Sequence, residues 1–191
     1  MEASHGEGRW TAQDELILRA AERLRRGLPR HPLTGLLHFR GSRYADALDA
    51  VLADFHPAGM PLSLVLADLD QLGVVNDNYG RAAGDEALEA VGQALGEMVR
   101  PLDLVMTSGG DAFVLILLGA DLRVAVTRAE RARATVRQLA IQRVPSGVSA
   151  SFGVAAPSGA ATARQLIEQA FAAERQARRR GGDRVEVAPV H

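Results

Sequence analysis

Acidic residues stand at the ends of two strongly apolar runs in this chain. Asp68 and Asp70 follow the run 62–67, which has the composition of a buried strand, and Asp111 lies in a Gly-Gly-Asp cluster between two further apolar runs. Carboxylates at the end of a buried strand are costly unless a positive or hydrogen-bonding group meets them. Paired carboxylates with few other protein ligands suit Mg²⁺, which keeps waters and borrows phosphate oxygens. The pattern therefore points to a site for a nucleoside triphosphate.

The segment 108–113, Ser-Gly-Gly-Asp-Ala-Phe, joins two β-prone runs and predicts the turn of a β-hairpin over about 103–118. Glycine tolerates the positive φ angles of tight turns and lets another molecule approach the backbone closely. Most turns of this composition have no chemical role. The chemistry therefore depends on whether the fold brings Asp111 beside Asp68, although the two are far apart in sequence.

The composition limits the classes of function. The 191 residues are 47% hydrophobic and 4% aromatic, carry a net charge of −1 and include no cysteine. The charge argues against a general nucleic-acid or membrane-surface binder, and the lack of cysteine excludes disulfides, thiolate catalysis and Cys-ligated zinc. The first residues contain no apolar signal region, and no stretch is long enough to cross a bilayer. We expect a cytoplasmic protein with neither nucleic-acid nor membrane partners.

Hydrophobic periodicity predicts helices over about 12–26, 43–55, 82–99, 122–141 and 162–180. Strands are expected at 61–67, in the hairpin, at 148–155 and, as a short edge strand, at 184–187. Thr11 and Ser42 are the predicted caps of the first two helices, residues 1–9 are expected to fray, and 31–37 and 74–80 are expected to be turns. The order predicts an α+β domain, a ferredoxin-like palm with a central, mostly antiparallel sheet flanked by helices.

Two groups of arginines are expected to be solvated. The first ends the N-terminal helix, and the second lies along the helix 122–141; they comprise Arg23, Arg25 and Arg26, and Arg128, Arg131, Arg133 and Arg137. The chain is expected to divide into a tail and helix at 1–27 and one domain at 28–191.

Several segments resemble, in the right order, the motifs of the GGDEF family, the diguanylate cyclases, which condense two GTP into cyclic di-GMP. The segment 31–36 is similar to D-x-L-T-G-L with His31 for Asp, and 68–85 to D-x-D-x-F-K-x-x-N-D…G-D. The signature, a strand motif and the C-terminal G-R-N-R-V are matched by 108–113, 149–155 and 181–185. The resemblance covers about 28–187 and implies a nucleotidyl cyclase-like palm.

The resemblance also implies the roles of individual residues. The metal ligands would be Asp68, the carbonyl of Leu69 and Asp111, and Mg²⁺ is expected only together with a bound nucleotide. Guanine would be read by Asn76 and Asp85, because an amide and a carboxylate offer the donors and acceptors that the base edge requires. The remaining nucleotide contacts would come from Gly109, Gly110 and Arg178, the last of which replaces a family lysine.

Departures from the family pattern bear on catalysis. Ala112 stands where the family has the signature glutamate, which is needed for the metal and for the attacking 3′-hydroxyl. Further changes are Gly73 for a phosphate-binding lysine, Thr107 and Gly182 for arginines, and Glu174-Arg175 for a Leu-Tyr pair that packs the last helix. Losing one preorganised electrostatic group costs roughly 10²–10³ in rate. We therefore expect negligible cyclase turnover and no catalytic residue, unless Arg179 or Arg180 replaces the lost cations.

A second constellation is Arg100-Pro101-Leu102-Asp103, which resembles the R-x-x-D of the family's inhibitory site for cyclic di-GMP at the right spacing from Gly109. A guanidinium can bond guanine O6 and N7, and a carboxylate can accept from guanine N–H groups. The alternative is structural: Arg100 at a helix end complements the dipole, and Asp103 begins a strand.

These observations leave three functions open. The first is an inactive receptor that binds cyclic di-GMP through Arg100 and Asp103 and signals to a protein partner or as a homodimer. The second is a GTP-binding or protein-interaction module that uses the degenerate active site. The third is a weakly active diguanylate cyclase.

Overall fold

The computed structural model describes residues 11–38, 43–108 and 110–189, and the bounds below refer to these ranges. The helices are α1 (Ala12–Arg25), α2 (Arg43–Phe55), α3 (Leu72–Tyr79), α4 (Arg81–Met98), α5 (Leu122–Arg137) and α6 (Ala163–Arg179). The strands are β1 (Leu37–His38), β2 (Leu62–Leu69), β3 (Leu104–Thr107), β4 (Ala112–Leu118), β5 (Ala150–Ala155) and β6 (Val185–Val187).

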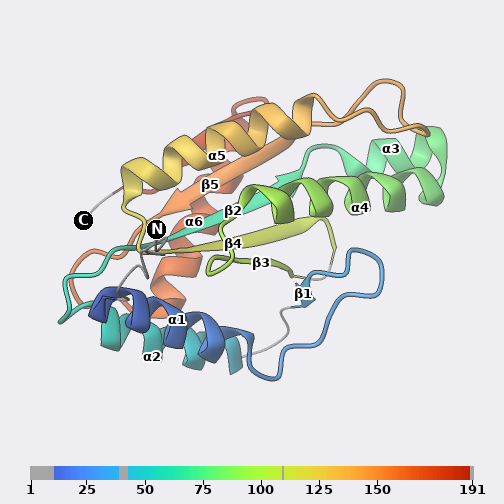
Figure 1. The fold of residues 1–191 in the computed structure, drawn as a ribbon. Coiled ribbons are helices and arrows are strands. Elements are labelled where there is room, and N and C mark those ends of the chain that lie inside the picture. Colours follow the sequence, from blue (N-terminus) through green and yellow to red (C-terminus); the bar gives the residue numbers. More distant parts are fainter. Residues whose placement is uncertain (1–10, 39–42, 109, 190–191) are drawn as a thin grey trace, which may run out of the picture.

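The strands of the described residues form one sheet in the order β1-β3-β4-β2-β5-β6. The central pairs, β3–β4, β4–β2 and β2–β5, are antiparallel, whereas β1 and β6 add to the two edges in parallel. The predicted α+β palm with a mostly antiparallel sheet is confirmed, and so is the edge position of the last strand. Figure 1 shows this mixed sheet between two layers of helices.

The two helix layers bury opposite faces of the sheet. One layer holds α1, α2 and α6, and the other holds α3, α4 and α5 (Figure 1). Strand β2 is buried along its whole length, as its continuous apolar sequence predicts for a central strand. Its side chains alternate between the two faces of the sheet. Leu64 and Leu66 pack against the first helix layer, and Val65 and Ala67 pack against the second.

Helix α6 approaches β5 very closely at Gly153. A Cβ atom there would lie 2.2 Å from the Ala170 carbonyl oxygen and 2.3 Å from the Glu174 nitrogen, which no side chain tolerates. The glycine therefore allows the backbones of helix and strand to touch. This contact lays the C-terminal half of α6 over the end of β2, where the acidic residues lie.

Two elements form where turns were expected. Helix α3 replaces the expected turn at 74–80, because Val75 is buried in the core and outweighs the turn preference of the neighbouring polar residues. Gln71, with φ 56°, and Gly80, with φ 85°, bound this short helix. Strand β1 replaces part of the expected turn at 31–37, because Leu37 pairs in parallel with Met106.

Other boundaries differ by a few residues. Thr11 caps α1 in a capping box with Asp14, as predicted, whereas Ser42 and residues 1–9 lie outside the described residues. Helix α5 ends at Arg137, and β5 begins at Ala150 rather than at 148. In the described part of the chain, no helix combines the length and the apolar composition that a membrane crossing requires.

Candidate functional site

The carboxyl end of β2 gathers the predicted metal ligands. Asp68 pairs with Ala112 on β4 and with Ser151 on β5, so the side chains of all three lie on the face covered by α6. The N–H of Leu69 donates to the carbonyl oxygen of Asp111 (3.2 Å), which holds the hairpin turn at the same edge. The structure therefore brings Asp68, Leu69 and Asp111 together, as the sequence predicted.

The Asp68 carboxyl lies in a strongly unfavourable environment for a negative charge. Burial raises its pKa from 3.8 to about 7, and the nearby carboxylate of Asp111 contributes to this rise. Arg178 opposes the shift, because its Nη1 lies 3.0 Å from Asp68 Oδ1, while Glu174 and Asp70 reinforce it. The Arg178 side chain is half exposed, so water weakens the ion pair, and burial outweighs it.

Arg178 also approaches a second buried acid on its own helix. Its Nε lies 3.7 Å from Oε1 of Glu174, a residue that is only 3% exposed. That oxygen accepts no hydrogen bond from any described residue, and burial raises the pKa of the carboxyl group. Where the family has leucine, α6 of this chain therefore carries a buried carboxyl group.

Asp70 is a structural residue rather than a free ligand. Its carboxylate accepts from Ser149 Oγ (2.7 Å), Ser151 Oγ (2.6 Å) and the N–H of Asp183 (2.9 Å). A Cβ at Gly182 would lie 2.9 Å from this carboxyl group, so the glycine allows the C-terminal loop to close on it. Asp70 thus ties that loop to β5.

The donor set meets the needs of Mg²⁺ only in part. Asp68 and Asp111 are neighbours, but Arg178 already bonds one oxygen of Asp68, and no group of three or more His, Asp or Glu among the described residues is arranged to hold a metal ion. Mg²⁺ requires near-octahedral oxygen coordination and readily takes phosphate oxygens. These residues therefore suit a cation delivered with a nucleotide and do not suit a resident cation.

The two predicted guanine-reading residues lie on the adjacent helices α3 and α4. Asn76 on α3 lies over Gly84 of α4 so closely that a Cβ on the glycine would be 2.0 Å from Asn76 Oδ1. The next residue, Asp85, is exposed at the start of the same helix. Gly110, with φ 142°, has open space around it, whereas Gly109 lies outside the described residues.

The structure describes three of the positions that depart from the family pattern or were expected to compensate for it. The Ala112 methyl group is 8% exposed and packs in the core next to Val114. Gly73 lies on α3 with no atom within 4 Å of its would-be Cβ, and it carries no cationic side chain where the family has lysine. Arg180, a candidate substitute, pairs instead with Glu186 on β6 (2.9 Å).

The second constellation is centred on a buried carboxylate. The Asp103 side chain is fully buried, and its two oxygens accept from the backbone, Nε and Nη2 of Arg100, from the N–H of Leu118 and from Nη1 of Arg128 (2.7 Å). Asp103 therefore holds both arginines in place, and its carboxylate is enclosed by these partners. The expectation that Arg128 belongs to a solvated face is wrong, since it closes this network.

Arg100 and Arg128 line a hollow of about 390 Å³ together with Arg131 and Glu97. The sequence alone did not locate further arginines for this site. The spacing of Arg128 and Arg131 in the sequence could have indicated them, because residues three apart on a helix share one face, as these two do on α5. Arg133 is partly exposed and pairs with Asp183 (2.9 Å).

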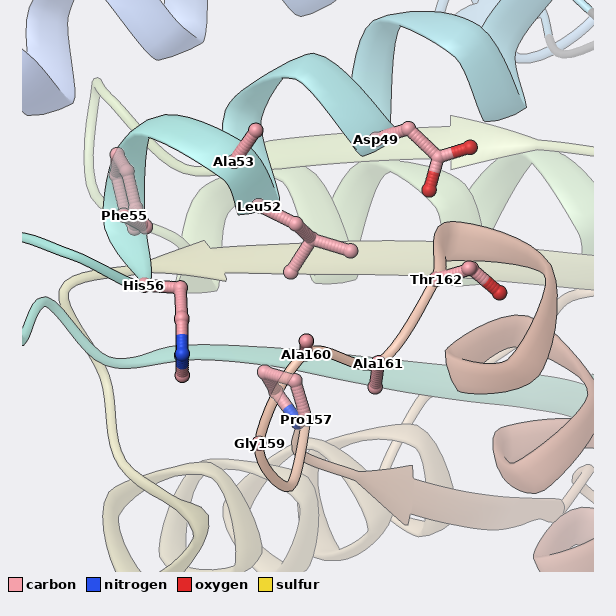
Figure 2. Close-up of a pocket in the computed structure, with 10 residues that line it drawn as sticks. All are labelled: Asp49, Leu52, Ala53, Phe55, His56, Pro157, Gly159, Ala160, Ala161 and Thr162. Carbon is pink, nitrogen blue, oxygen red and sulfur yellow. The ribbon is translucent and has the colours of Figure 1, made fainter.

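Another hollow lies beyond the opposite end of β2 from Asp68, between the end of α2 and the loop 157–162 (Figure 2). Leu52 and Pro157 line it, and Asp49 closes one side by accepting from the N–H of Ala163 (2.6 Å). It has a volume of about 280 Å³, and no residue of either constellation described above lines it.

Comparisons with known proteins give one consistent result. A family model described as "Diguanylate cyclase, GGDEF domain" matches residues 29–184. The chain is 34% identical over 139 residues to the diguanylate cyclase DosC of Escherichia coli. It superposes on the coiled coil and GGDEF domain of DgcB from Caulobacter crescentus in complex with c-di-GMP, with a TM-score of 0.77, 26% identity, and 93% of this chain and 94% of that chain covered.

It also superposes on the diguanylate cyclase SiaD from Pseudomonas aeruginosa, solved in complex with its activator SiaC. The TM-score is 0.72 at 30% identity, with 91% of this chain and 65% of that chain covered. The match to DosC covers 71% of this chain but 30% of DosC, and other curated relatives are covered over 23% to 42% of their length. The chain thus spans less than half of these relatives.

Proposed function

Since this chain belongs to the GGDEF domain family of diguanylate cyclases, we propose that it is a catalytically inactive member that binds cyclic di-GMP at the Arg100–Asp103 turn. Cyclases of this family generally use Mg²⁺. In this chain the binding of a guanine nucleotide, rather than its synthesis, would carry a signal to a protein partner or to a second copy.

The loss of catalysis is supported by the register of β2 and β4. Because Asp68 pairs directly with Ala112, a glutamate at position 112 would place its carboxylate on the same face, beside Asp68 and Asp111. The methyl group supplies no ligand there, and Arg178 neutralises Asp68 instead. Phosphoryl transfer depends on positioned charge around the phosphates, so this edge lacks the means to drive it.

The binding proposal is carried by one observation: Asp103 orients Arg100 and Arg128 beside Arg131 at one hollow. Guanidinium groups bond the O6 and N7 acceptors of guanine and pair with phosphates, and a cyclic dinucleotide offers both. Side chains held in place before binding lose less conformational entropy on binding. Asp103 acts in this proposal by positioning the arginines from below the hollow.

Titration calorimetry with cyclic di-GMP tests the proposal on the full chain. Arg131→Ala is the informative variant, because Arg131 lines the hollow and is exposed. Arg123→Ala on the same helix is the matched control, because Arg123 lies outside the hollow and the variant removes the same charge. We expect binding by the wild type and the control and at least tenfold weaker binding by Arg131→Ala. No heat with the wild type, or equal affinities, would refute the proposal.

A second function is favoured by the retention of both predicted guanine-reading residues, Asn76 and Asp85; Asn76 lies against Gly84, the residue before Asp85. GTP binding there without turnover would make the chain a GTP-binding module. Calorimetry with a non-hydrolysable GTP analogue and Mg²⁺, repeated with Asn76→Ala, tests this candidate. Chromatography of a GTP incubation with Mg²⁺ or Mn²⁺ tests the third candidate, and sustained product that disappears in Asp111→Ala would make the chain an active cyclase.

A further inference from the structure

Helix α1 is joined to the Arg100–Asp103 turn by one arginine. Nη2 of Arg25 donates to the carbonyl oxygens of Pro101 and Asp103, the latter at 3.0 Å. The sequence predicted that the arginines at this end of the helix are solvated. Arg25 departs from that prediction because it is partly buried, whereas Arg23 and Arg26 are exposed and make no such contact. The contact links segments more than 70 residues apart in sequence.

The turn that Arg25 contacts is the one that presents Arg100. The N–H of Asp103 closes the turn on the Arg100 carbonyl oxygen (3.0 Å), and the Asp103 carboxylate holds the Arg100 guanidinium. Arg25 bonds two other carbonyls of the same short segment, so it restrains the turn in addition to Asp103's own bonds. The Arg100 side chain lines two neighbouring hollows, one shared with Arg131 and one with Arg25.

Helix α1 is otherwise held by few fully buried side chains. Ala20, Ala21 and Leu24 are its buried residues, and they pack in the core that α2 also covers. Two of these three are alanines, which bury little apolar area. Leu16 and Ile17 also pack against this core, and Arg23 pairs with Asp54 on α2. A peripheral helix of this kind opens at a lower free energy than the central sheet. Arg25 differs from these contacts because it joins the helix to the turn.

We propose that Arg25 is a positioning residue for the Arg100–Asp103 turn and couples the docking of α1 to occupancy of the cyclic di-GMP site. The inference rests on the proposed function for its ligand, but the contact between α1 and the turn does not depend on any ligand. Ligand that engages Arg100 stabilises the turn and, through Arg25, the docked helix. By linkage, undocking of α1 weakens ligand binding by the same factor.

The test compares Arg25→Gln with Arg23→Gln on the full chain. Both variants remove one positive charge from α1, but Arg23 pairs with Asp54 on α2 and not with the turn. Couplings between sites are typically about 5- to 150-fold in affinity, so we expect cyclic di-GMP to bind Arg25→Gln at least about fivefold more weakly. Arg23→Gln is expected to stay within twofold of the wild type, and Arg25→Lys, which can donate to both carbonyls, is expected to recover part of the loss.

Hydrogen exchange gives a readout without ligand. In Arg25→Gln the amide of Asp103, which donates to the Arg100 carbonyl oxygen, is expected to exchange faster than in Arg23→Gln. In the wild type, cyclic di-GMP is expected to slow exchange along α1. Equal exchange at the turn in the two variants would overturn the inference even if the wild type binds ligand. Absence of binding by the wild type refutes the proposed function, and the exchange comparison then decides the coupling of α1 to the turn by itself.

Discussion

Replacing Asp68 by asparagine should make the protein more stable at neutral and alkaline pH. The folded state raises the pKa of this carboxyl group from 3.8 to about 7, chiefly by burial. At roughly 1.36 kcal/mol per unit, a shift of about three units costs the folded state about 4 kcal/mol once the group is ionised. The group is partly open to water, so this figure is an upper bound. An asparagine side chain would fill nearly the same volume without the charge, so the cost disappears.

The sign of the effect follows from proton binding. Between about pH 4 and pH 7 the folded protein keeps a proton on Asp68 that the unfolded chain has already released, so a rise in pH across this window favours unfolding. Below the window both states are protonated, and above it both are ionised. The stability advantage of Asp68→Asn should therefore be small near pH 4, grow through the window and level off above pH 7.

Urea denaturation of both proteins at a series of pH values measures this difference directly. Other carboxylates titrate in both proteins, so only the difference between them is informative. Asp77→Asn is the control, because Asp77 is exposed on α3 and its replacement should change stability by less than about 0.5 kcal/mol at every pH. An Asp68→Asn protein that is less stable than the wild type at pH 8, or a difference independent of pH, would refute the reasoning.

Of three further predictions, the first two concern the face of the sheet that α6 covers, and the third concerns α3 on the other face. Ala112→Glu restores a carboxylate opposite Asp68 and should raise turnover of GTP with Mg²⁺ roughly 10²-fold above the wild-type background, measured by chromatography of the product; an unchanged rate would show that other losses limit the reaction. Gly153→Ala should destabilise the protein by about 1–3 kcal/mol or more in urea denaturation, because its Cβ would meet the backbone of α6. Gly73→Ala, on open helix surface, should instead stabilise by up to about 1 kcal/mol, and a loss of stability there would contradict the assigned helix.

The parts of the fold that depend on local pattern were predictable. Strand β2 is indicated by a continuous apolar run, and α6 by its helical spacing and its Thr162 cap. Helix α3 was missed because its propensity is poor and its stability comes from the burial of Val75 in the core. Strand β1 was missed because two residues carry no periodic signal, and only their partner strand makes them a strand.

The two sites also differ in how far the sequence predicts them. The meeting of Asp68 with Asp111 follows from the topology of a palm, so a resemblance in motif order sufficed to predict it. The R-x-x-D pattern connects Asp103 with Arg100, but its other partners come from β4 and α5, and no local pattern connects these with Asp103. From the sequence alone the arginines were interpreted as solvated, because the sequence does not indicate where the charged group of such a long side chain lies.

The constellation around Asp68 and the constellation around Asp103 lie far apart, so a change at one need not alter the other. This separation makes an inactive receptor physically reasonable. Strand β4 begins at Ala112, beside Asp68, and ends at Leu118, whose N–H bonds Asp103. At about 3.3 Å per residue the strand sets them roughly 20 Å apart, and changes at such a distance with no shared partner act almost additively. Loss of the carboxylate at position 112 therefore leaves the Arg100 turn intact. A buried carboxylate that holds two arginines adds little to stability compared with apolar residues of similar volume, which accords with the binding role proposed for the Arg100–Asp103 turn.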